Sequence, residues 1–412
     1  MGDRIADDGV ASEMSRRQLL HSAAWMSGAV ATGVSSWVLQ PPWANAAAPS
    51  IKVGIATDLT GAIAYAGNAN VNTARMVVKD INDAGGILGR PIALFVADTA
   101  SNESVAVANV RRLIQRDQVD VVLGGITSSM RNAIKDVIVT RGKTLYIYPE
   151  QYEGKECTPY LFCTGPTLSQ QCDQFVPWLI RNGGKRFALP ASNYVFPRAV
   201  NEHARELIQN NGGEVIFEEY YPVDQIEYGA TVSRIITNNV EVVLNTIIPP
   251  GVGPFFKQLY EAGFGKRGGR LACLYYDESA LNINEPEEIE GLANCLDYFR
   301  AATQEDTASA RIQAEYDREF PGKILFAAGT GATGMYRGLK LWELAVKEVG
   351  NLDREHVAAA LDHAKIDKGP GGPAEMVPGK RHCKMNMYTA VAKNGSFEIV
   401  ARSAGLVDPK AC

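Results

Sequence analysis

The chain beyond residue 50 alternates between two hydrophobic patterns. Most positions are apolar in four short segments: 51–56, 91–96, 119–123 and 143–148. Continuous apolar runs of this length are typical of strands buried on both faces. Between them, apolar residues recur at three- and four-residue steps, at Val71, Ala74, Val78, Ile81 and at Ala106, Val110, Leu113, Ile114. That spacing puts them on one face of a helix, so the sequence predicts a doubly wound α/β unit with right-handed crossovers.

The same alternation restarts after Thr164-Gly165-Pro166. Helical spacing covers 170–180, 198–210 and 229–238. Strand-like runs cover 186–190, 214–221, 241–246, 271–275 and 291–298. The restart predicts a second α/β lobe and not a continuation of one long sheet.

The C-terminal third shows no clear third α/β unit. Its helical segments are 307–320, 333–349 and 354–364. We expect them to complete lobes already begun, so that the chain crosses between lobes more than once. The predicted lobes are 51–165 plus about 299–378, and 166–298 plus about 379–405. The Gly/Pro-dense stretch 368–373 is predicted to be a loop or late crossover outside either lobe.

The first residues have the pattern of an export signal. Arg16 and Arg17 precede a weakly apolar stretch at 19–39 and a small-residue run at 44–48. Paired arginines, a modest apolar region and an A-x-A site are typical of a twin-arginine signal, here 1–47, that directs the protein to the periplasm. A membrane anchor is the alternative, but polar residues interrupt the stretch and no later segment has roughly eighteen consecutive apolar residues.

Composition excludes several kinds of partner and site. With 46% hydrophobic residues, a net charge of -5 and no Lys/Arg-rich run, the chain is not predicted to bind nucleic acid or anionic membranes. None of its seven cysteines forms a C-x-x-C motif, which argues against zinc-ribbon and thioredoxin-type sites. In an oxidising compartment we expect nearest-neighbour disulfides, with Cys172 free: Cys157 with Cys163, Cys273 with Cys295, and Cys383 with Cys412.

Four segments carry a family resemblance that covers residues 51 to about 400. They are Ala84-Gly85-Gly86-Ile87-Leu88-Gly89-Arg90-Pro91-Ile92, Tyr148-Pro149-Glu150-Gln151-Tyr152-Glu153-Gly154, Ser192-Asn193-Tyr194-Val195-Phe196-Pro197-Arg198 and Val242-Val243-Leu244-Asn245-Thr246-Ile247. The chain resembles type I periplasmic solute-binding proteins of the branched-chain amino-acid class, and within it the urea and short-chain-amide receptors. The resemblance implies two doubly wound lobes joined by a hinge of several crossovers, which close on a ligand and deliver it to the permease of an ABC importer.

Candidate ligand contacts follow the predicted strands of both lobes. Ligands of open α/β sheets bind beyond the carboxyl ends of strands, where helix N-termini offer free N–H groups. The candidates are Thr127, Ser128, Ser129, Tyr148, Glu150, Gln151 and Tyr152 in one lobe, and Tyr194, Ile248, Asp277 and Glu278 in the other. We expect Glu150 to accept from a ligand N–H₂ group and Tyr194 to close over the ligand. A serine there can also be an ordinary N-cap, and single tyrosines are often half-buried packing residues.

Two departures from the urea-type pattern leave the ligand open. Ile248-Pro249-Pro250-Gly251-Val252-Gly253 replaces a short polar loop, which hints at a larger or more apolar ligand. Asp277 or Glu278 stands where amino-acid receptors of the class carry an acid for the ammonium group. A branched-chain or other amino-acid receptor is therefore the alternative within the same fold.

Enzyme interpretations find little support. Residues 329–334 spell G-x-G-x-x-G, but no strand ending in an acid follows about twenty residues on, so a glycine-rich helix start bordering the cleft is predicted instead of a dinucleotide site. The chain has no G-x-S-x-G or H-E-x-x-H, and its histidines lack metal-ligand spacing. No catalytic residue, metal or cofactor is predicted. An exported cofactor-dependent oxidoreductase is the alternative of another class, and a cytosolic amide-sensing regulator of this fold is disfavoured by the signal.

Overall fold

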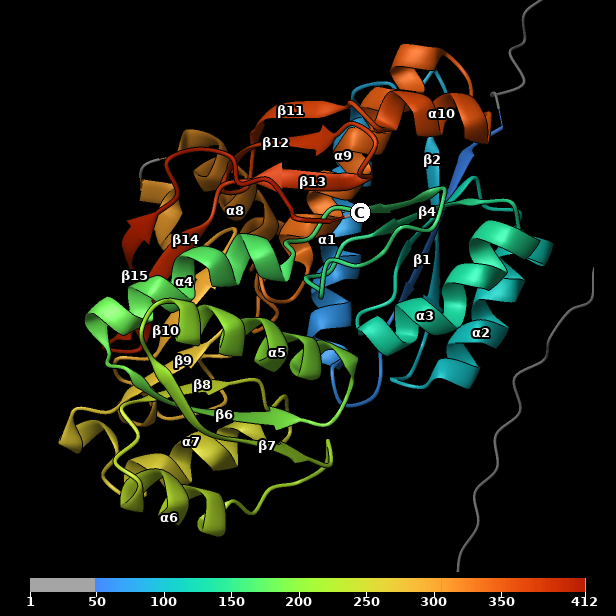
Figure 1. The fold of residues 1–412 in the computed structure, drawn as a ribbon. Helices are drawn as coiled ribbons and strands as arrows, with labels where there is room; N and C mark the ends of the chain where they lie inside the picture. Colours follow the sequence, from blue (N-terminus) through green and yellow to red (C-terminus); the bar gives the residue numbers. More distant parts are fainter. Residues whose placement is uncertain (1–48, 305, 412) are drawn as a thin grey trace, which may run out of the picture. The chain divides into compact units, whose positions relative to one another are not determined.

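Two mixed β-sheets, each flanked by helices, form the part of the chain that the structure describes (Figure 1). The computed structural model describes residues 49–304 and 306–411, so the predicted export signal lies outside it. The first sheet contains β1 (Ile51–Thr57), β2 (Ile92–Asp98), β3 (Val121–Gly124), β4 (Leu145–Tyr148), β5 (Leu161–Cys163), β11 (Lys365–Gly369), β12 (Gly372–Val377) and β13 (His382–Met385). The second contains β6 (Arg186–Ser192), β7 (Glu214–Tyr221), β8 (Val242–Asn245), β9 (Arg270–Cys273), β10 (Ala293–Leu296), β14 (Tyr388–Lys393) and β15 (Ser396–Arg402).

The strand orders are those of two doubly wound lobes with antiparallel additions. The first sheet runs β11-β12-β13-β5-β4-β3-β1-β2, and the second runs β15-β14-β10-β9-β8-β6-β7. Strands β1 to β5 pair in parallel with one another, as do β6 to β10, whereas β11 with β12 and β14 with β15 are antiparallel hairpins. The predicted pair of α/β lobes is confirmed.

The helices lie between the parallel strands in sequence, as crossovers require. They are α1 (Ala64–Asp83), α2 (Glu103–Arg112), α3 (Ser128–Asp136), α4 (Leu168–Asn182), α5 (Val195–Asn210), α6 (Gly229–Thr237), α7 (Val252–Glu261), α8 (Thr307–Glu319), α9 (Ala332–Val349) and α10 (Arg354–Leu361). Single π-helical turns, 113–117 and 137–141, follow α2 and α3, and 3₁₀ turns cover 265–267, 286–288 and 300–304.

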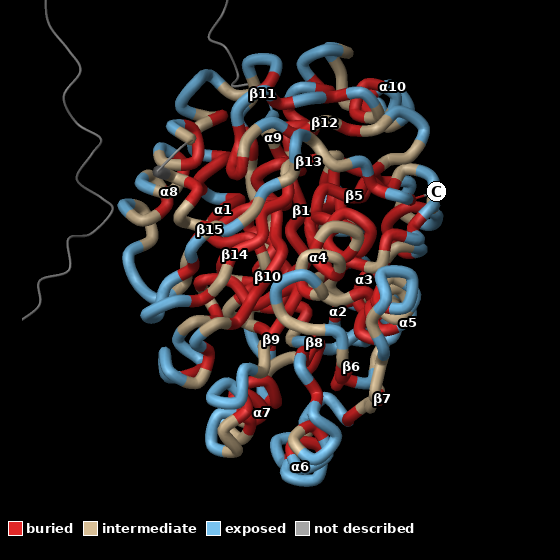
Figure 2. The backbone as a smooth tube through the Cα atoms, turned by 60° about the vertical axis from the view of Figure 1, so that its left-hand side comes forward, coloured by how far each residue is buried: buried red, intermediate tan, exposed pale blue. Residues whose placement is uncertain are grey.

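Alternate residues of the first sheet enter two different cores. Val53 of β1, Leu123 of β3 and Ile147 of β4 pack with the apolar sides of α1 and α9. Val122 and Tyr146 face the opposite way, toward α2 and α3. Figure 2 shows buried residues concentrated along the strands and on the helix sides that meet them. Burial on both faces explains why these strands are continuously apolar and do not alternate.

The chain passes between the two sheets three times. The crossovers are the links 164–167 after β5, 297–299 after β10 and 386–387 between β13 and β14. The third one comes after Met385, not near residue 378, because β13 pairs with β5 of the first sheet. The Gly/Pro-dense stretch is not a free loop either. It forms the turn of the β11–β12 hairpin, with Gly371 and Gly372 at positive φ.

A buried ion pair connects two of these crossovers. Arg337 of α9 donates to Asp297 at 2.6 Å and, through Nε, to the carbonyl oxygen of Thr164 at 3.0 Å. The side chains of Arg337 and Asp297 are 1% and 0% exposed. Thr333 adds a 2.7 Å hydrogen bond to the same carboxylate oxygen. The first two crossovers are therefore joined by one guanidinium group.

The cysteines do not form the predicted pairs. Cys163, Cys172, Cys273, Cys295 and Cys383 are buried free thiols, which contradicts all three expected disulfides. The neighbouring-strand pair 273 and 295 stays reduced inside the core. Cys157 is disulfide-bonded. Cys412 lies outside the described residues.

Among the described residues, no helix combines the length and the apolarity that a bilayer crossing needs.

Candidate ligand-binding site

Loops from the carboxyl ends of strands in both sheets surround a small cavity, here called the inner chamber. Its volume is about 70 Å³. It is lined by Ile63, Tyr65, Ala66, Ile126, Thr127, Ser128, Glu150, Gln151, Tyr194, Phe196, Ile248, Pro249, Tyr275 and Gly329. Gly329 precedes α9, and the other lining residues follow β1, β3 and β4 in one lobe and β6, β8 and β9 in the other. The chamber thus lies where open α/β sheets bind ligands.

A second, wider space adjoins the chamber and is here called the outer groove. Its volume is about 420 Å³. It is lined by Asp58, Ala62, Ile63, Ser101, Glu103, Thr127, Ser129, Met130, Tyr194, Val223, Asp224, Ile248, Pro249 and Pro250. Five of these residues line both spaces, so a ligand in the chamber can extend into the groove. Neither set of lining residues includes a lysine, arginine or histidine.

Glu150 is the buried acidic group of the inner chamber. It follows β4, is 3% exposed, and its Oε1 accepts a 2.6 Å hydrogen bond from Asn70 of α1. Burial raises the pKa of Glu150 well above its usual range, and the nearby charge of Asp58 adds to the rise. The shift favours the protonated carboxyl group, in which one oxygen accepts and the hydroxyl donates.

Because Gly331 has no side chain, the Glu150 carboxyl group can occupy the space beside it. It caps α9 at φ 75°, and a Cβ there would overlap both carboxyl oxygens. The predicted glycine-rich helix start is thus confirmed, and Gly329 at its beginning lines the chamber. Gly329 approaches the backbone of Tyr275 so closely that a side chain would collide with its carbonyl oxygen. This loop therefore brings the two lobes' strand-end segments together.

Replacing Gly331 by Ala should weaken ligand binding at least tenfold, because the methyl group displaces the Glu150 carboxyl. Gly350 is the matched control: it ends the same helix at φ 69°, and a Cβ at that position would have no atom within 4 Å. Both variants carry the left-handed backbone cost of about 1–2 kcal/mol. Isothermal titration of both proteins separates the effects, and equal affinity in the two would remove Gly331 from this role.

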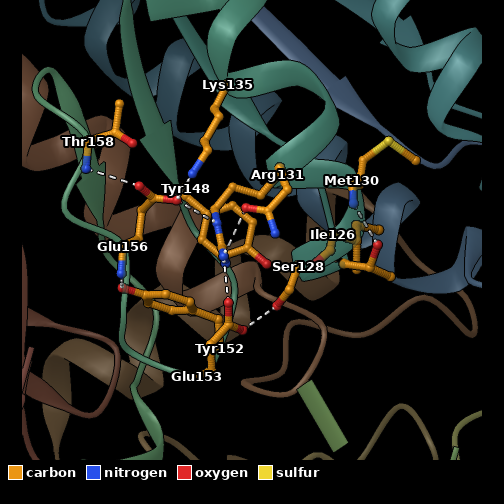
Figure 3. Close-up of polar contacts among 12 residues, drawn as sticks. Ile126, Ser128, Met130, Arg131, Lys135, Tyr148, Tyr152, Glu153, Glu156 and Thr158 are labelled. Atoms are coloured by element: carbon orange, nitrogen blue, oxygen red, sulfur yellow. Dashed lines mark hydrogen bonds and ion pairs between the residues drawn. The ribbon is translucent and has the colours of Figure 1, made fainter. Parts of the chain in front are cut away.

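The start of α3 is held by a buried charged cluster (Figure 3). Thr127, not a serine, is the N-cap: its hydroxyl accepts from the Met130 N–H at 3.1 Å. The Ser128 hydroxyl donates to Glu153 at 2.5 Å, and Glu153 in turn pairs with Arg131 at 2.5 Å. Ser128 lines the chamber, so the ion pair behind it fixes one wall.

Arg131 is enclosed by aromatic rings as well as carboxylates. Its guanidinium lies 5.0 Å from the ring centre of Tyr148 and 4.6 Å from that of Tyr152, and it pairs with Glu156 at 3.2 Å. Lys135 also reaches Glu156, at 2.9 Å. With its charge neutralised and its side chain 3% exposed, Arg131 does not present a cation to the chamber.

Tyr148 and Tyr152, two of the contacts predicted from the sequence, line neither the inner chamber nor the outer groove. Tyr148 belongs to the β4 face that meets α3, and its hydroxyl donates to the Ile126 carbonyl at 2.8 Å. The Tyr152 hydroxyl is hydrogen-bonded to His382 Nε2, and the two rings stack. Burial lowers the pKa of His382 to about 4, so this ring is neutral. Both tyrosines support the wall behind the cavity.

The structure brings most of the other predicted residues to the cavity. Thr127, Ser128, Glu150, Gln151, Tyr194 and Ile248 line the inner chamber, and Ser129 lines only the outer groove. Tyr194 lies at the start of α5 in the second lobe, opposite the Glu150 loop. Burial raises the pKa of its hydroxyl, which therefore stays neutral. Whether these side chains bind a ligand remains a prediction.

Asp277 and Glu278, the two acidic residues after β9, lie in different environments. Asp277 is 1% exposed and lies behind the chamber wall, where its Oδ1 accepts from the Ser279 N–H at 2.8 Å. Burial raises its pKa to about 7, and its charge raises the pKa of Tyr65, a chamber residue. Glu278 accepts from the Arg300 N–H at 2.6 Å and lines neither space.

Sequence reasoning missed several cavity residues. Tyr65 of α1 lines the inner chamber, and Asn70 of the same helix holds Glu150 without lining either space; a tyrosine or asparagine within an amphipathic helix gives no signal of its own. Tyr275 lies two residues before the predicted acidic pair and could have been found from that position. Asp58 follows β1 immediately, and the end of a strand is also the kind of position that drew attention to Thr127.

No group of three or more possible metal ligands occurs among residues 49–304 and 306–411.

Comparison with known proteins gives the family. The profile of the periplasmic binding protein family matches residues 50–396. The Leu/Ile/Val-binding protein BraC3 of Rhizobium johnstonii is 27% identical over 237 residues, which cover 56% of this chain and 59% of BraC3. A Leu/Ile/Val-binding protein homologue of Brucella melitensis is 26% identical over 331 residues, 78% of this chain and 85% of the relative.

A solved structure has the same fold. It is a solute-binding protein of an ABC transporter from Rhodopseudomonas palustris, in complex with 3,4-dihydroxybenzoic acid. The match has a TM-score of 0.78 at 24% identity and covers 87% of this chain and 99% of that one. These proteins are named for binding and not for catalysis. With a family match over most of its length and two lobes of this fold, the chain belongs to the periplasmic binding protein family.

Proposed function

We propose that this protein is the extracytoplasmic receptor of an ABC importer, and that it binds urea, a short-chain amide or a related small polar compound. The family, the two lobes and the cavity between their strand ends support a receptor that binds by lobe closure. Its export through the twin-arginine route and its delivery of ligand to a membrane permease belong to the same proposal. Related proteins are named for different ligands, so the ligand of this protein has to be inferred from the residues that line its cavity.

The size of the inner chamber is the observation that carries the proposal. A water-sized group needs about 10–15 Å³, so the 70 Å³ chamber accommodates roughly five to seven non-hydrogen atoms. Urea, acetamide and propionamide fit within that number. Leucine and dihydroxybenzoate exceed it and would have to occupy the outer groove as well.

The lining also favours a neutral head group over a carboxylate. No basic side chain lines the chamber, while Glu150 offers one acceptor and one donor. A primary amide has the complementary donor and acceptor side by side, so it can form two hydrogen bonds with a protonated carboxyl group. Tyr65, Tyr194 and Tyr275 supply ring faces and neutral hydroxyls around it.

An amino acid is the second candidate. The first turn of α3 could hold a carboxylate on its free N–H groups, and Asp277 lies behind the wall next to Tyr65. Against it, Asp277 lines neither the inner chamber nor the outer groove, so an ammonium group in either space would not contact it.

Native mass spectrometry followed by a thermal-shift screen separates these candidates. Urea, acetamide, propionamide, leucine, isoleucine and dihydroxybenzoate would be compared, since a bound ligand raises apparent stability by mass action. We expect the amides or urea to raise the melting temperature most. A shift with leucine or dihydroxybenzoate alone would refute the amide proposal and leave the receptor fold.

Replacing Glu150 by Ala should weaken amide binding by about 1–3 kcal/mol, or roughly 5- to 150-fold in Kd, because two hydrogen bonds are lost. Glu150→Gln should lose less, since a neutral amide still accepts and donates. Tyr194→Phe removes only a hydroxyl, whereas Tyr194→Ala also opens the chamber. Isothermal titration measures all four, with circular dichroism to confirm folding. Unchanged affinity in both alanine variants would place the ligand elsewhere.

A further inference from the structure

The outer groove has an acidic lining that the head group in the inner chamber does not use. Asp58, Glu103 and Asp224 are its charged lining residues, and they come from both lobes. Glu103 begins α2, and Asp224 follows β7. Both are exposed, while Asp58 is fully buried. A ligand group that enters the groove therefore meets carboxylates on both sides and no positive charge.

Asp58 is the member that a structural role does not explain. Its side chain is 0% exposed, yet neither carboxylate oxygen accepts a hydrogen bond of normal geometry. Burial raises the pKa of Asp58, and the charge of Asp98 adds to the rise. The hydroxyls of Ser101 and Thr99 and the Ser101 N–H are close enough to favour the charged form, but burial outweighs them. A buried carboxyl without aligned donors is costly and rare in folded proteins. A ligand group with several hydrogen-bond donors in the outer groove would supply aligned donors for the Asp58 carboxyl oxygens.

The remaining lining suits a short hydrocarbon chain. Ile63, Ile248 and Pro249 are shared with the inner chamber, and Met130 lies on the groove side. Tyr194 lines both spaces as well, and an aromatic face attracts a nearby cation. The path from the chamber to the carboxylates is therefore apolar along one side. This agrees with the apolar loop at 248–253, which hinted at a ligand larger than urea.

Building on the proposed amide function, we infer that the preferred ligand is an amino amide. Its amide or ureido head occupies the inner chamber, a short aliphatic linker passes Ile248 and Pro249, and a primary ammonium group lies in the outer groove. There it donates to Asp58, with Glu103 and Asp224 at the rim adding attraction through solvent. The division of the site into two spaces with five shared residues accounts for both ends of such a molecule.

A matched ligand series tests the inference. Butyramide, γ-aminobutyramide and succinamic acid share an amide head and a similar chain, and end in a methyl, an ammonium and a carboxylate group. Isothermal titration on the intact protein should show γ-aminobutyramide binding at least about tenfold more tightly than butyramide. Succinamic acid should bind more weakly than either. Equal affinity for butyramide and γ-aminobutyramide overturns the inference and leaves the proposed amide receptor standing.

Asp58→Asn should reduce the ratio of the two affinities to near one, because the charge is lost while the shape is kept. Asp136→Asn is the control: Asp136 pairs with Arg141 on the surface of the same lobe and lines neither space, so it should keep the wild-type ratio. If Asp58→Asn does not fold, Glu103→Gln with Asp224→Asn should still lower the ratio. An unchanged ratio in Asp58→Asn refutes the assignment. Failure of all three amides to bind refutes the proposed function itself.

Discussion

Replacing Arg337 by Met is expected to lower the free energy of unfolding by about 3–5 kcal/mol, because it leaves Asp297 charged, buried and without its partner. The pair is almost fully buried, and Arg337 also donates to the Thr164 carbonyl. Loss of that donor leaves a second acceptor unsatisfied. Chemical denaturation monitored by tryptophan fluorescence would measure the difference, since Trp342 lies on the same helix.

The control is the double variant Arg337→Met with Asp297→Leu. Removing both charges avoids the unpaired carboxylate, so most of the lost stability should return. A matched surface control is Arg141→Met, whose partner Asp136 is 53% exposed, and it should cost less than about 1 kcal/mol. If Arg337→Met is as stable as Arg141→Met, the two crossovers are not held by this ion pair.

Stability should fall as the pH rises from about 5 to about 8. Burial raises the pKa of Asp277 to about 7, and burial together with the charge of Asp277 raises that of Glu278 to about 8. Glu150 shifts in the same direction. In the unfolded chain these groups titrate near pH 4, so between pH 4 and their folded pKa values the folded protein holds more protons. Their stabilisation is complete below pH 4 and is lost as the pH rises through 7–8.

Denaturation in guanidinium chloride across that pH range measures the slope. The double variant Asp277→Asn with Glu278→Gln should have a flatter profile, since it keeps acceptors for the Ser279 and Arg300 N–H groups without titrating. The difference in the free energy of unfolding between this variant and the wild-type protein should shift in favour of the variant as the pH rises. Parallel profiles for the two proteins would show that these carboxyl groups do not control the pH response.

The parallel core of the fold could be predicted because its pattern is local. Strands buried on both faces read as short apolar runs, and the helices between them show one apolar side. The short strand β5 and the C-terminal strands could not be predicted in this way. Strand β5 has only three residues, and the β11–β12 hairpin turns within a Gly/Pro-rich segment that gives a loop signal. Which sheet β13 joins depends on a pairing with β5 more than two hundred residues away.

The site was predictable in its location but not in the direction of its side chains. Strand ends pointed to Glu150, Gln151 and Tyr194, which line the chamber. Tyr148 and Tyr152 follow the same strand but turn toward Arg131, whose pairing with Glu153 and Glu156 depends on the folded loop. The disulfide expectation failed for a related reason: nearness in sequence does not bring buried thiols into bonding geometry.

The three crossovers set what kind of motion the lobes can make. They contain four, three and two residues, and the shortest, 386–387, provides about 7 Å of extended chain. Three crossovers this short restrict translation of one lobe relative to the other. Changes in a few backbone torsion angles still allow the lobes to rotate about a hinge. The length of the crossovers would then control how far the two lobes can open around the inner chamber and the outer groove. Lengthening 386–387 by inserted glycines would loosen the axis without altering any group that lines the cavity.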